Sequence, residues 1–415
     1  MKYCSRCLYP ENHPLGITFD NDGVCSGCRE HEEKEKINWT ERFEELKDLC
    51  NRYKSPHSSS PNCIVPVSGG KDSLFIAHTV KHVLGMHPLL VNYNRHYNTK
   101  IGIRNLAYLR TLVGCDIITS TVSPQTTKKI TKETLRLLGD IYWHCNAGTT
   151  AFAVQTATRF KIPLIIWGAH EGCEKTGMVS IADRVEMSRE YRKKFELGGV
   201  EAEDLVNLSS ELTLADLEPY VYPDQDEIDA IGVRGVYLSN YIRWDSKKQH
   251  EDMIAKYGYE CSPQQRTFDT YNDVDCFHYA GLNDWIQFQK FGYGLVTEHA
   301  SREIRRGRLT KEQGQELETY YLSVQPKDAV IFLKWLGITQ KELESYIEPH
   351  RDPNVWEYID EHWNRKAAIN DVNESNTEQP PILPSSCQFS LPIPRTLSVE
   401  DSYLLMGRGF VDTQD

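Results

Sequence analysis

The fold of this chain is decided by one stretch, Asn62-Cys63-Ile64-Val65-Pro66-Val67-Ser68-Gly69-Gly70-Lys71-Asp72-Ser73-Leu74-Phe75. Its first half is a β-branched apolar run that predicts a short buried strand, and helical spacing of apolar residues begins near Asp72. The two glycines between these elements let backbone N–H groups converge, and the positive end of the helix dipole points to the same place. Lys71 adds a full charge and Ser73 a hydroxyl. This turn is therefore predicted to hold phosphate.

The spacing of this loop distinguishes it from other phosphate loops. A Walker A loop needs Gly, four residues and then Gly-Lys-Ser/Thr, a pattern that the stretch lacks. Ser68-Gly69-Gly70-Lys71-Asp72-Ser73 instead resembles the pyrophosphate loop of ATP pyrophosphatases, the fold of N-type ATP-dependent amidotransferases and tRNA thiolases. The resemblance implies catalytic roles for Lys71, Asp72 and Ser73. A glycine turn that only joins a strand to a helix is the alternative, and the complete strand–turn–helix context argues against it.

Further strands and helices alternate after the loop. Apolar runs predict strands at 88–94, 116–120 and 162–168 and within 231–245, and a periodic segment predicts a helix over 100–113. This alternation predicts an α/β fold with a doubly wound, mostly parallel sheet of the ATP pyrophosphatase type, also described as adenine nucleotide alpha hydrolase-like. In such sheets the ligand lies at the carboxyl ends of the strands.

Residues at those carboxyl ends are expected to bind ATP. Asn92 closes the second strand, Thr149 lies where a small-residue helix begins, and Gly168 lets a ligand approach the backbone closely. His170 and Glu171 follow at the expected rim of the site, where a plain polar loop is the alternative. The predicted ATP-binding set is Ser68, Gly69, Gly70, Lys71, Asp72, Ser73, Asn92, Thr149 and Gly168.

Residues 1–37 carry two Cys-x-x-Cys pairs, Cys4 with Cys7 and Cys25 with Cys28. Paired knuckles at this separation predict a zinc ribbon with four thiolate ligands. Four thiolates leave no open coordination position, so the metal site is expected to be structural. An iron–sulfur cluster and four unrelated reduced cysteines are the alternatives. Between the pairs, residues 16–23 are predicted to form a strand that ends in a turn.

The composition limits the class of protein. The formal net charge is −12 and the chain contains 12 cysteines. The acidic balance weighs against a broad nucleic-acid surface. No apolar run approaches the roughly 18–20 residues of a membrane span, and the N-terminus has no signal-peptide core, so a cytoplasmic protein is expected. Cysteines in a cytoplasmic chain favour metal or redox chemistry over disulfides.

The chain divides by composition into four parts. The zinc module covers 1–37, and the α/β domain covers 38–300, with a helix at 38–54 and a linker at 55–61. Within that domain, a charged insertion at 180–230 is predicted to be helical and to cover the cleft or make a subunit contact. A helical region is expected at 301–366, and an acidic tail at 367–415 is expected to be largely disordered.

Polar groups for a substrate concentrate in the second half of the chain. Residues 267–300 are dense in such groups, and Arg302-Glu303-Ile304-Arg305-Arg306-Gly307-Arg308 carries four arginines. A charge run of this kind is either a solvated helix face or a site that binds a carboxylate or diphosphate through guanidinium forks. The substrate candidates are His170, Glu171, Asp269, His278, Asn283, Asp284, Arg302 and Arg305.

Several motifs occur together and in order. Besides the cysteine pairs and the loop, they are Gly148-Thr149-Thr150-Ala151, Ile165-Ile166-Trp167-Gly168, Trp244-Asp245, Phe268-Asp269-Thr270-Tyr271 and Ser301-Arg302-Glu303-Ile304-Arg305. Over residues 1–366 the chain resembles the N-acetyl sugar amidotransferases of bacterial surface-polysaccharide assembly, including O-antigen and lipopolysaccharide. The resemblance implies a ligase that uses ATP and Mg²⁺ to turn a sugar acetamido group into an acetamidino group. One departure is Ala169-His170, where the family often has Glu-Asn, and it leaves the exact sugar open.

The resemblance also implies partners. Ammonia would come from a separate glutaminase subunit, since the chain has no nucleophile-elbow cysteine domain. The acceptor would be an N-acetylated sugar, either nucleotide-linked or sialic-acid-like, and a homo-oligomer is left open. A tRNA thiolase, which adenylylates a carbonyl and then adds sulfur, is the alternative from another class. Its sulfur carrier would be Cys145 or Cys173. A non-catalytic nucleotide-binding subunit is the third reading.

Overall fold

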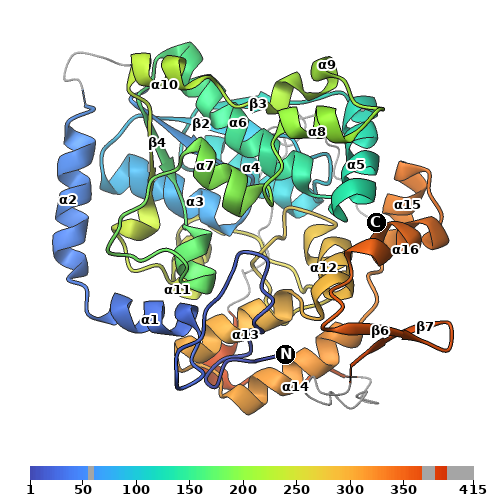
Figure 1. Cartoon of the computed structure of the whole chain (residues 1–415). Helices are drawn as coiled ribbons and strands as arrows, with labels where there is room; N and C mark the ends of the chain where they lie inside the picture. The colour runs from blue at the N-terminus through green and yellow to red at the C-terminus, as the bar shows by residue number, and fades with distance from the viewer. Residues whose placement is uncertain (55–59, 367–378, 390–415) are drawn as a thin grey trace, which may run out of the picture.

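The computed structural model describes residues 1–54, 60–366 and 379–389. The predicted linker at 55–61 and the acidic tail at 367–415 therefore lie largely outside the described residues. Within the described residues, no helix has the length and apolar character needed to cross a membrane. Figure 1 shows an upper α/β layer above a lower region that the N-terminal segment shares with the helices between residues 284 and 323, while the helices between residues 329 and 347 lie at the right of the view.

The upper layer is built on a five-stranded sheet. Its strands are β1 (Cys63–Pro66), β2 (Pro88–Tyr93), β3 (Ile117–Ser120), β4 (Leu164–Trp167) and β5 (Arg234–Tyr237). They lie in the order β3-β2-β1-β4-β5, and every pair is parallel. The order reverses between β1 and β4, which confirms the doubly wound α/β fold and places the topological switch point at these two strands.

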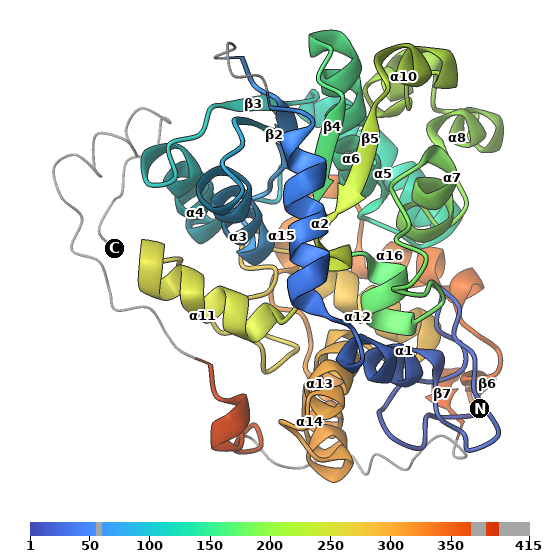
Figure 2. The same ribbon diagram turned by 90° about the vertical axis from the view of Figure 1, so that its left-hand side faces the viewer.

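Alternate residues of each strand enter different cores. Val65 packs with Leu74 and Leu109 on one face, whereas Ile64 packs with Val154 and Ala157 on the other. The first face is covered by α2 (Trp39–Asn51), α3 (Lys71–His78), α4 (Lys100–Thr111) and α11 (Ser246–Tyr257). The second is covered by α6 (Trp143–Phe160), α7 (Arg189–Tyr191), η3 (Arg192–Glu196) and α10 (Gln225–Ile231). Figure 2 shows the sheet between these layers. Burial on both faces explains the nearly continuous apolar runs of β1 and β4.

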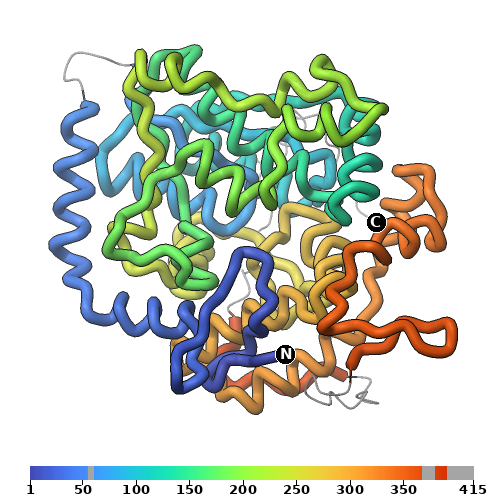
Figure 3. The backbone as a smooth tube through the Cα atoms, viewed as in Figure 1, coloured from blue at the N-terminus to red at the C-terminus, as the bar shows by residue number. Residues whose placement is uncertain are grey.

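The expected helical C-terminal part begins after residue 283. Its helices are α12 (Asp284–Phe291), α13 (Leu295–Arg305), α14 (Lys311–Ser323), α15 (Ala329–Leu336) and α16 (Gln340–Ile347). The N-terminal segment lies across α13 and α14, as the tube in Figure 3 shows. There, the Leu8 N–H donates to Ser301 Oγ at 3.2 Å and the Lys311 ammonium donates to the Cys4 carbonyl at 2.6 Å. α1 (Ser26–Glu35) continues from the second cysteine pair toward α2.

Shorter elements connect these parts. After α3 the helix continues as η1 (Thr79–Val83), and α5 (Pro124–Leu138) packs beside α6. The other short elements are η2 (Gly172–Thr176), α8 (Ala202–Leu208), α9 (Leu214–Leu217), η4 (Glu218–Tyr220), η5 (Leu238–Asn240), η6 (Tyr279–Asn283) and η7 (Glu348–His350).

Four local predictions need correction. Residues 16–23 form no strand, because the Asp20 carboxylate accepts the N–H groups of Asp22 and Val24 and folds the segment into a turn. The insertion is not helical at 180–188, where the Met187 N–H instead pairs with the Gly235 carbonyl beside β5.

The other two corrections concern the C-terminal part. Within 301–366, a hairpin replaces helix at β6 (Trp356–Ile359) and β7 (His362–Arg365). Of the tail, residues 379–389 are ordered around η8 (Ser385–Cys387), because Cys387 is fully buried against the α13–α14 core and the Phe389 ring lies 5.1 Å from that of Tyr271.

Buried neutral histidines make this fold sensitive to acid. Burial lowers the pKa to about 3 in His144 and His250. It lowers the pKa to about 4 in His13, His170, His278 and His299. An unfolded histidine takes up a proton near pH 6.5, whereas the folded one does so only near pH 4. The unfolded chain therefore binds more protons below pH 6.5, and the free energy of unfolding falls as the pH drops through this window.

We expect urea midpoints to fall steeply between pH 6.5 and pH 4 and to change little between pH 7 and pH 8. His278→Phe should reduce the acid loss, because this ring packs edge-on against Tyr97 and Phe332. The exposed His87→Phe is the matched control. The same fall in urea midpoint between pH 6.5 and pH 4 in both variants would contradict this origin of the acid sensitivity.

Candidate functional site

The loop after β1 is held open by its own backbone and side chains. Ser68 Oγ accepts the Gly70 N–H at 3.1 Å, and Ser73 Oγ accepts the Ser68 N–H at 2.9 Å. Gly69 has φ +95, and a Cβ there would lie 2.4 Å from the Gly102 carbonyl oxygen of α4. Glycine is required at this position both by conformation and by space. The loop then enters α3 at Lys71, so the N-terminus of that helix points into the site.

A cavity of about 320 Å³ lies at the switch point, outside the carboxyl ends of β1 and β4. We call it the loop cavity. Its walls include Ser68 and Ser73 after β1, Gly168 after β4, and Thr149 of α6. Open sheets bind their ligands at this place because two adjacent loops diverge there. Glu196 also lines it, and burial together with the Glu171 carboxylate raises the pKa of Glu196 to about 8.

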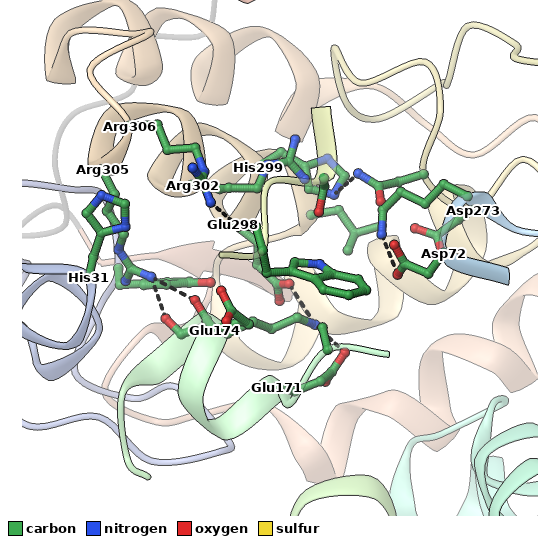
Figure 4. Close-up of a pocket in the computed structure, with 18 of the residues that line it drawn as sticks. His31, Asp72, Glu171, Glu174, Asp273, Glu298, His299, Arg302, Arg305 and Arg306 are labelled. Atoms are coloured by element: carbon green, nitrogen blue, oxygen red, sulfur yellow. Dashed lines mark hydrogen bonds and ion pairs between the residues drawn. The ribbon is translucent and has the colours of Figure 1, made fainter. Parts of the chain in front are cut away.

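A second cavity, of about 230 Å³, adjoins the first and is shown in Figure 4. We call it the arginine cavity, because Arg302, Arg305 and Arg306 of the α13 end form one wall. Its other walls come from the loop (Lys71, Asp72), from the segment after β4 (Ala169, Glu171, Glu174, Lys175) and from the N-terminal module (Tyr9, His31). Asp72, Ala169, Glu171, Asp273 and Tyr279 line both cavities. The two cavities therefore meet at Asp72.

Lys175 joins the walls of the arginine cavity. Its ammonium lies 3.1 Å from the Glu171 carboxylate and 3.2 Å from that of Glu298 on α13. Burial lowers the pKa of Lys175, but these two carboxylates outweigh it and hold the pKa well above its ordinary value. Lys175 is therefore charged near neutral pH, and it connects the segment after β4 to α13.

Arg302 is oriented by acids that do not themselves line the cavity. Its guanidinium donates to Asp269 at 2.8 Å and to Glu303 at 2.6 Å, and it lies over the Tyr271 ring. Asp269 also accepts the N–H groups of Tyr271 and Asn272. Burial opposes ionisation of Asp269, yet the neighbouring His299 and Arg302 lower its pKa below the ordinary range. A fully buried carboxylate with these partners fixes the guanidinium in place.

The four cysteines of the N-terminal module come together in one cluster. Their sulfur atoms all lie within 4.8 Å of one another, with 3.9 Å between Cys4 and Cys28 and 3.6 Å between Cys7 and Cys25. A tetrahedral zinc with Zn–S bonds of about 2.3 Å requires S···S distances of about 3.8 Å, so the cluster fits this metal. All four side chains are buried.

Arg305 connects this cluster to the arginine cavity. Its guanidinium approaches Cys25 Sγ at 3.6 Å and donates to the Lys175 carbonyl at 2.6 Å, while lying over the Tyr9 ring. A cation beside thiolates offsets their negative charge. The metal module therefore forms part of the cavity wall through Tyr9, His31 and this arginine.

The structure brings some predicted site residues together and separates others. Lys71, Asp72, Glu171, Arg302 and Arg305 line the arginine cavity, and Ser68, Ser73, Thr149 and Gly168 line the loop cavity. Gly69 and Gly70 shape the loop between them. Asn92 borders a separate cavity on the other side of the loop, where its amide donates to the Val67 carbonyl at 2.9 Å.

The remaining substrate candidates lie outside both cavities. His170 is buried behind the rim, where its Nδ1 accepts the Cys173 N–H and its ring contacts Tyr191. Asp284 pairs with Arg266 at 2.6 Å, and His278 packs between aromatic rings. Asn283 lies in η6 and does not line either cavity, and Asp269 contacts the arginine cavity through Arg302 and Asn272. His170, Asp269, His278 and Asp284 are all buried.

Sequence reasoning did not select several residues that line the arginine cavity, namely Tyr9, His31, Lys175, Asp273 and Glu298. One signal was available for Lys175, which follows Glu171 by four residues. Tyr9 and His31 had none, since their place depends on how the N-terminal module packs.

Carboxylates that could hold Mg²⁺ are present where the cavities meet. Asp72 and Glu171 line both, and carboxylate oxygen is the ligand that Mg²⁺ prefers. The donor set therefore fits this ion, which would neutralise phosphate charge when bound.

We expect Cys4→Ser combined with Cys25→Ser to lose the bound metal and the folding of residues 1–37, because two of four ligands are removed. Elemental analysis should find zinc near one equivalent in the unmodified protein and almost none in the variant. Iron in its place would identify a cluster. Cys261→Ser, outside the cysteine cluster, is the control and should keep the metal. Stoichiometric zinc in the double variant would contradict the assignment.

Comparison with known proteins gives weak structural neighbours and one family match. An NH3-dependent NAD synthetase from Campylobacter jejuni shares 14% identity over 47% of this chain and 92% of its own, with a TM-score of 0.28. An NMN synthetase from Francisella tularensis shares 14% over 55% and 87%, with a TM-score of 0.25. The U34-tRNA thiolase NcsA from Methanococcus maripaludis, solved with its 4Fe-4S cluster, shares 12% over 74% and 86%, with a TM-score of 0.24.

The fold is defined by the chain's own parallel sheet order. The comparison with curated proteins gives no significant match. Residues 265–370 match the model for the C-terminal domain of WbpG-like LPS biosynthesis proteins, which confirms over this stretch the resemblance to proteins of bacterial surface-polysaccharide assembly.

Proposed function

We propose that this protein is an ATP-dependent amidotransferase that converts the acetamido group of an N-acetylated sugar to an acetamidino group. One observation carries the proposal. Lys71 and Asp72 of the pyrophosphate-type loop line the same cavity as Arg302 and Arg305, which belong to the stretch that matches the LPS biosynthesis family. A nucleotide site and a polar acceptor site thus share a wall.

The proposed chemistry overcomes the low reactivity of an amide toward ammonia. The acetamido oxygen attacks the α-phosphorus of ATP, the bond to pyrophosphate breaks, and an adenylyl imidate forms. Ammonia then adds to the imidate carbon and AMP leaves. ATP would occupy the loop cavity, where Ser68, Ser73 and the N-terminus of α3 surround the pyrophosphate. The sugar would occupy the arginine cavity, so that the acetamido group meets the α-phosphate near Asp72.

The chain's own residues would supply charge and position. Lys71 stabilises the charge that develops as pyrophosphate leaves, and its ammonium, now 2.6 Å from Asp72, would turn to the phosphate. Mg²⁺ held by Asp72 would share this charge. Arg302 and Arg305 are placed to bind an anionic part of the acceptor, such as a carboxylate or diphosphate.

Ammonia would come from a glutaminase subunit, because water competes for the imidate and a shielded supply avoids this loss. Such a complex would operate in the cytoplasm, where ATP and nucleotide sugars are made. Residues 180–230 and 267–300 contribute Met187, Glu196, Asp273 and Tyr279 to the cavity walls, and these segments are the proposed walls of the ammonia path.

The tRNA thiolase remains the second candidate because of one observation. Cys145 lines the loop cavity, whereas Cys173 is buried beside Glu30 away from it. Burial raises the pKa of the Cys145 thiol well above its ordinary value, which disfavours the thiolate that sulfur transfer needs. Transfer of labelled sulfur to tRNA would favour the thiolase, and labelled nitrogen in a sugar favours the amidotransferase.

We expect Lys71→Ala to reduce pyrophosphate release strongly, because one preorganised cationic contact contributes about 2–4 kcal/mol to transition-state stabilisation. Ser68→Ala should also lower it by freeing the Gly70 N–H. Lys341→Ala, exposed on α16, is the control. Unchanged circular dichroism with lost turnover supports the assignment. Turnover of Lys71→Ala within threefold of the unmodified protein would mean that the loop is structural.

Mass spectrometry tests the product directly. The protein is incubated with ATP, Mg²⁺, ammonium chloride and one of N-acetylglucosamine, UDP-N-acetylglucosamine or N-acetylneuraminic acid. Exchange of the acetamide oxygen for nitrogen should lower the sugar mass by about one dalton and leave AMP and pyrophosphate in equal amounts. Product formation should rise with pH as more ammonia is unprotonated, and glutamine alone should give none. Product from glutamine with this chain alone would contradict the need for a partner.

A further inference from the structure

A third cavity opens on the opposite side of one cavity wall. It has a volume of about 430 Å³ and we call it the side cavity. It is lined by residues 99–101 at the start of α4, by the loop 262–265, by 273, 274, 276, 277, 280 and 281, and by Asp328. Asp273 is the one residue, within the described part of the chain, that lines the side, arginine and loop cavities together.

The wall between the cavities is thin. Asn272 lines the arginine cavity, Val274 lines the side cavity, and Asp273 between them lines both. The segment is anchored on either side of this point, since Asn272 accepts from Gln264 Nε2 at 3.0 Å and Thr99 N–H donates to the Asp275 carbonyl at 3.2 Å. At Asp273 a single residue separates the side cavity from the place where the two site cavities meet.

Asp273 has an unusual backbone conformation. Its φ is +53, in the left-handed region that residues other than glycine adopt rarely. Such a conformation persists only where the surrounding structure holds it, and it is commonest at functional sites. Here it places Asp273 in the lining of three cavities. Burial and the nearby Asp275 raise the pKa of Asp273 to about 7, while Lys71 and Arg95 oppose the rise and Asp269 adds to it.

The charges of the side cavity suit a small cation. Asp273 and Asp328 contribute two carboxylates against the single ammonium of Lys100, within the described residues. The arginine cavity, in contrast, balances five lysine and arginine side chains with five carboxylates in its described lining. Ammonia is largely protonated near neutral pH, so it would be attracted to the side cavity, where carboxylates outnumber basic side chains, more than to the balanced arginine cavity. ATP and the sugar would also fill the other two cavities.

We propose that the side cavity is the entrance for ammonia and that the Asp273 carboxylate takes the proton of the entering ammonium ion. This proposal rests on the proposed amidotransferase function. The proton moves from NH₄⁺ to a carboxylate oxygen, leaving NH₃ with a free electron pair. That pair forms the C–N bond to the imidate carbon as the C–O bond to AMP breaks. Asp273 later releases its proton to solvent through the side cavity.

The entrance is tested by filling it. A Cβ on Gly281 would meet no atom closer than 3.9 Å, so this position accepts a side chain. Gly281→Leu should raise the KM for ammonium at least tenfold and leave the KM for ATP within twofold. Gly281→Ala, which leaves most of the cavity open, is the matched control and should stay within threefold of the unmodified protein for both substrates.

The proton transfer is tested with hydroxylamine, a nucleophile that is mostly unprotonated at neutral pH. Asp273→Asn cannot accept a proton, so it should raise the ratio of hydroxylamine-dependent to ammonium-dependent turnover at least tenfold. Gly281→Leu should lower turnover with both nucleophiles and leave this ratio within threefold. Each reaction uses the sugar that gives product with the unmodified protein.

Four results would overturn the proposal. An unchanged KM for ammonium in folded Gly281→Leu excludes the entrance, and an unchanged nucleophile ratio in Asp273→Asn excludes the proton transfer. An equal rise in the KM for ATP in Gly281→Leu would mean general damage to the site. If the unmodified protein gives no ammonium-dependent product with any of the three sugars, the proposed function itself fails and the entrance fails with it.

Discussion

The guanidinium of Arg305 joins three parts of the molecule that are far apart in the sequence. It approaches the sulfur atoms of Cys7 and Cys25 in the N-terminal module, and it donates to the carbonyl groups of Glu174 and Lys175 after β4. It is itself carried by α13, in the stretch that matches the LPS biosynthesis family. Any metal bound by the four thiolates thus stands one side chain away from the proposed acceptor site.

This connection would explain why a cysteine module that can hold a metal belongs to such a chain. The α/β layer alone provides the loop cavity, because β1, β4 and α6 supply its walls. The arginine cavity needs three layers, since Tyr9 and His31 close it from the N-terminal side and α13 closes it from the other. A small module with little apolar core depends on metal ligation for its folding. Its loss would open one wall of the cavity while leaving the sheet intact.

Charge balance is the second constraint on the site. The described lining of the arginine cavity holds five basic side chains and five carboxylates, and most of them are paired with one another or with buried acids. Buried charges are tolerated only when they are paired. An anionic substrate would therefore exchange with carboxylates already present, as Lys71 would leave Asp72 for phosphate. This exchange would make the cavity specific for anions. It would also keep the cations paired with carboxylates when the cavity is empty.

The sequence by itself determined the features that local patterns encode. The β1–loop–α3 unit, the alternation of strands and helices, and the four cysteines as one cluster follow from periodicity, glycine positions and ligand spacing, and the structure has all of them. It did not determine which polar residues face the site. Asp269, His278 and Asp284 are of the same polar residue types as those that line the cavities, yet they have buried partners or surroundings. Lys175 and Glu298, in contrast, meet across the arginine cavity from different elements. Only tertiary structure decided this, because the direction of a polar side chain depends on the packing of distant segments around it.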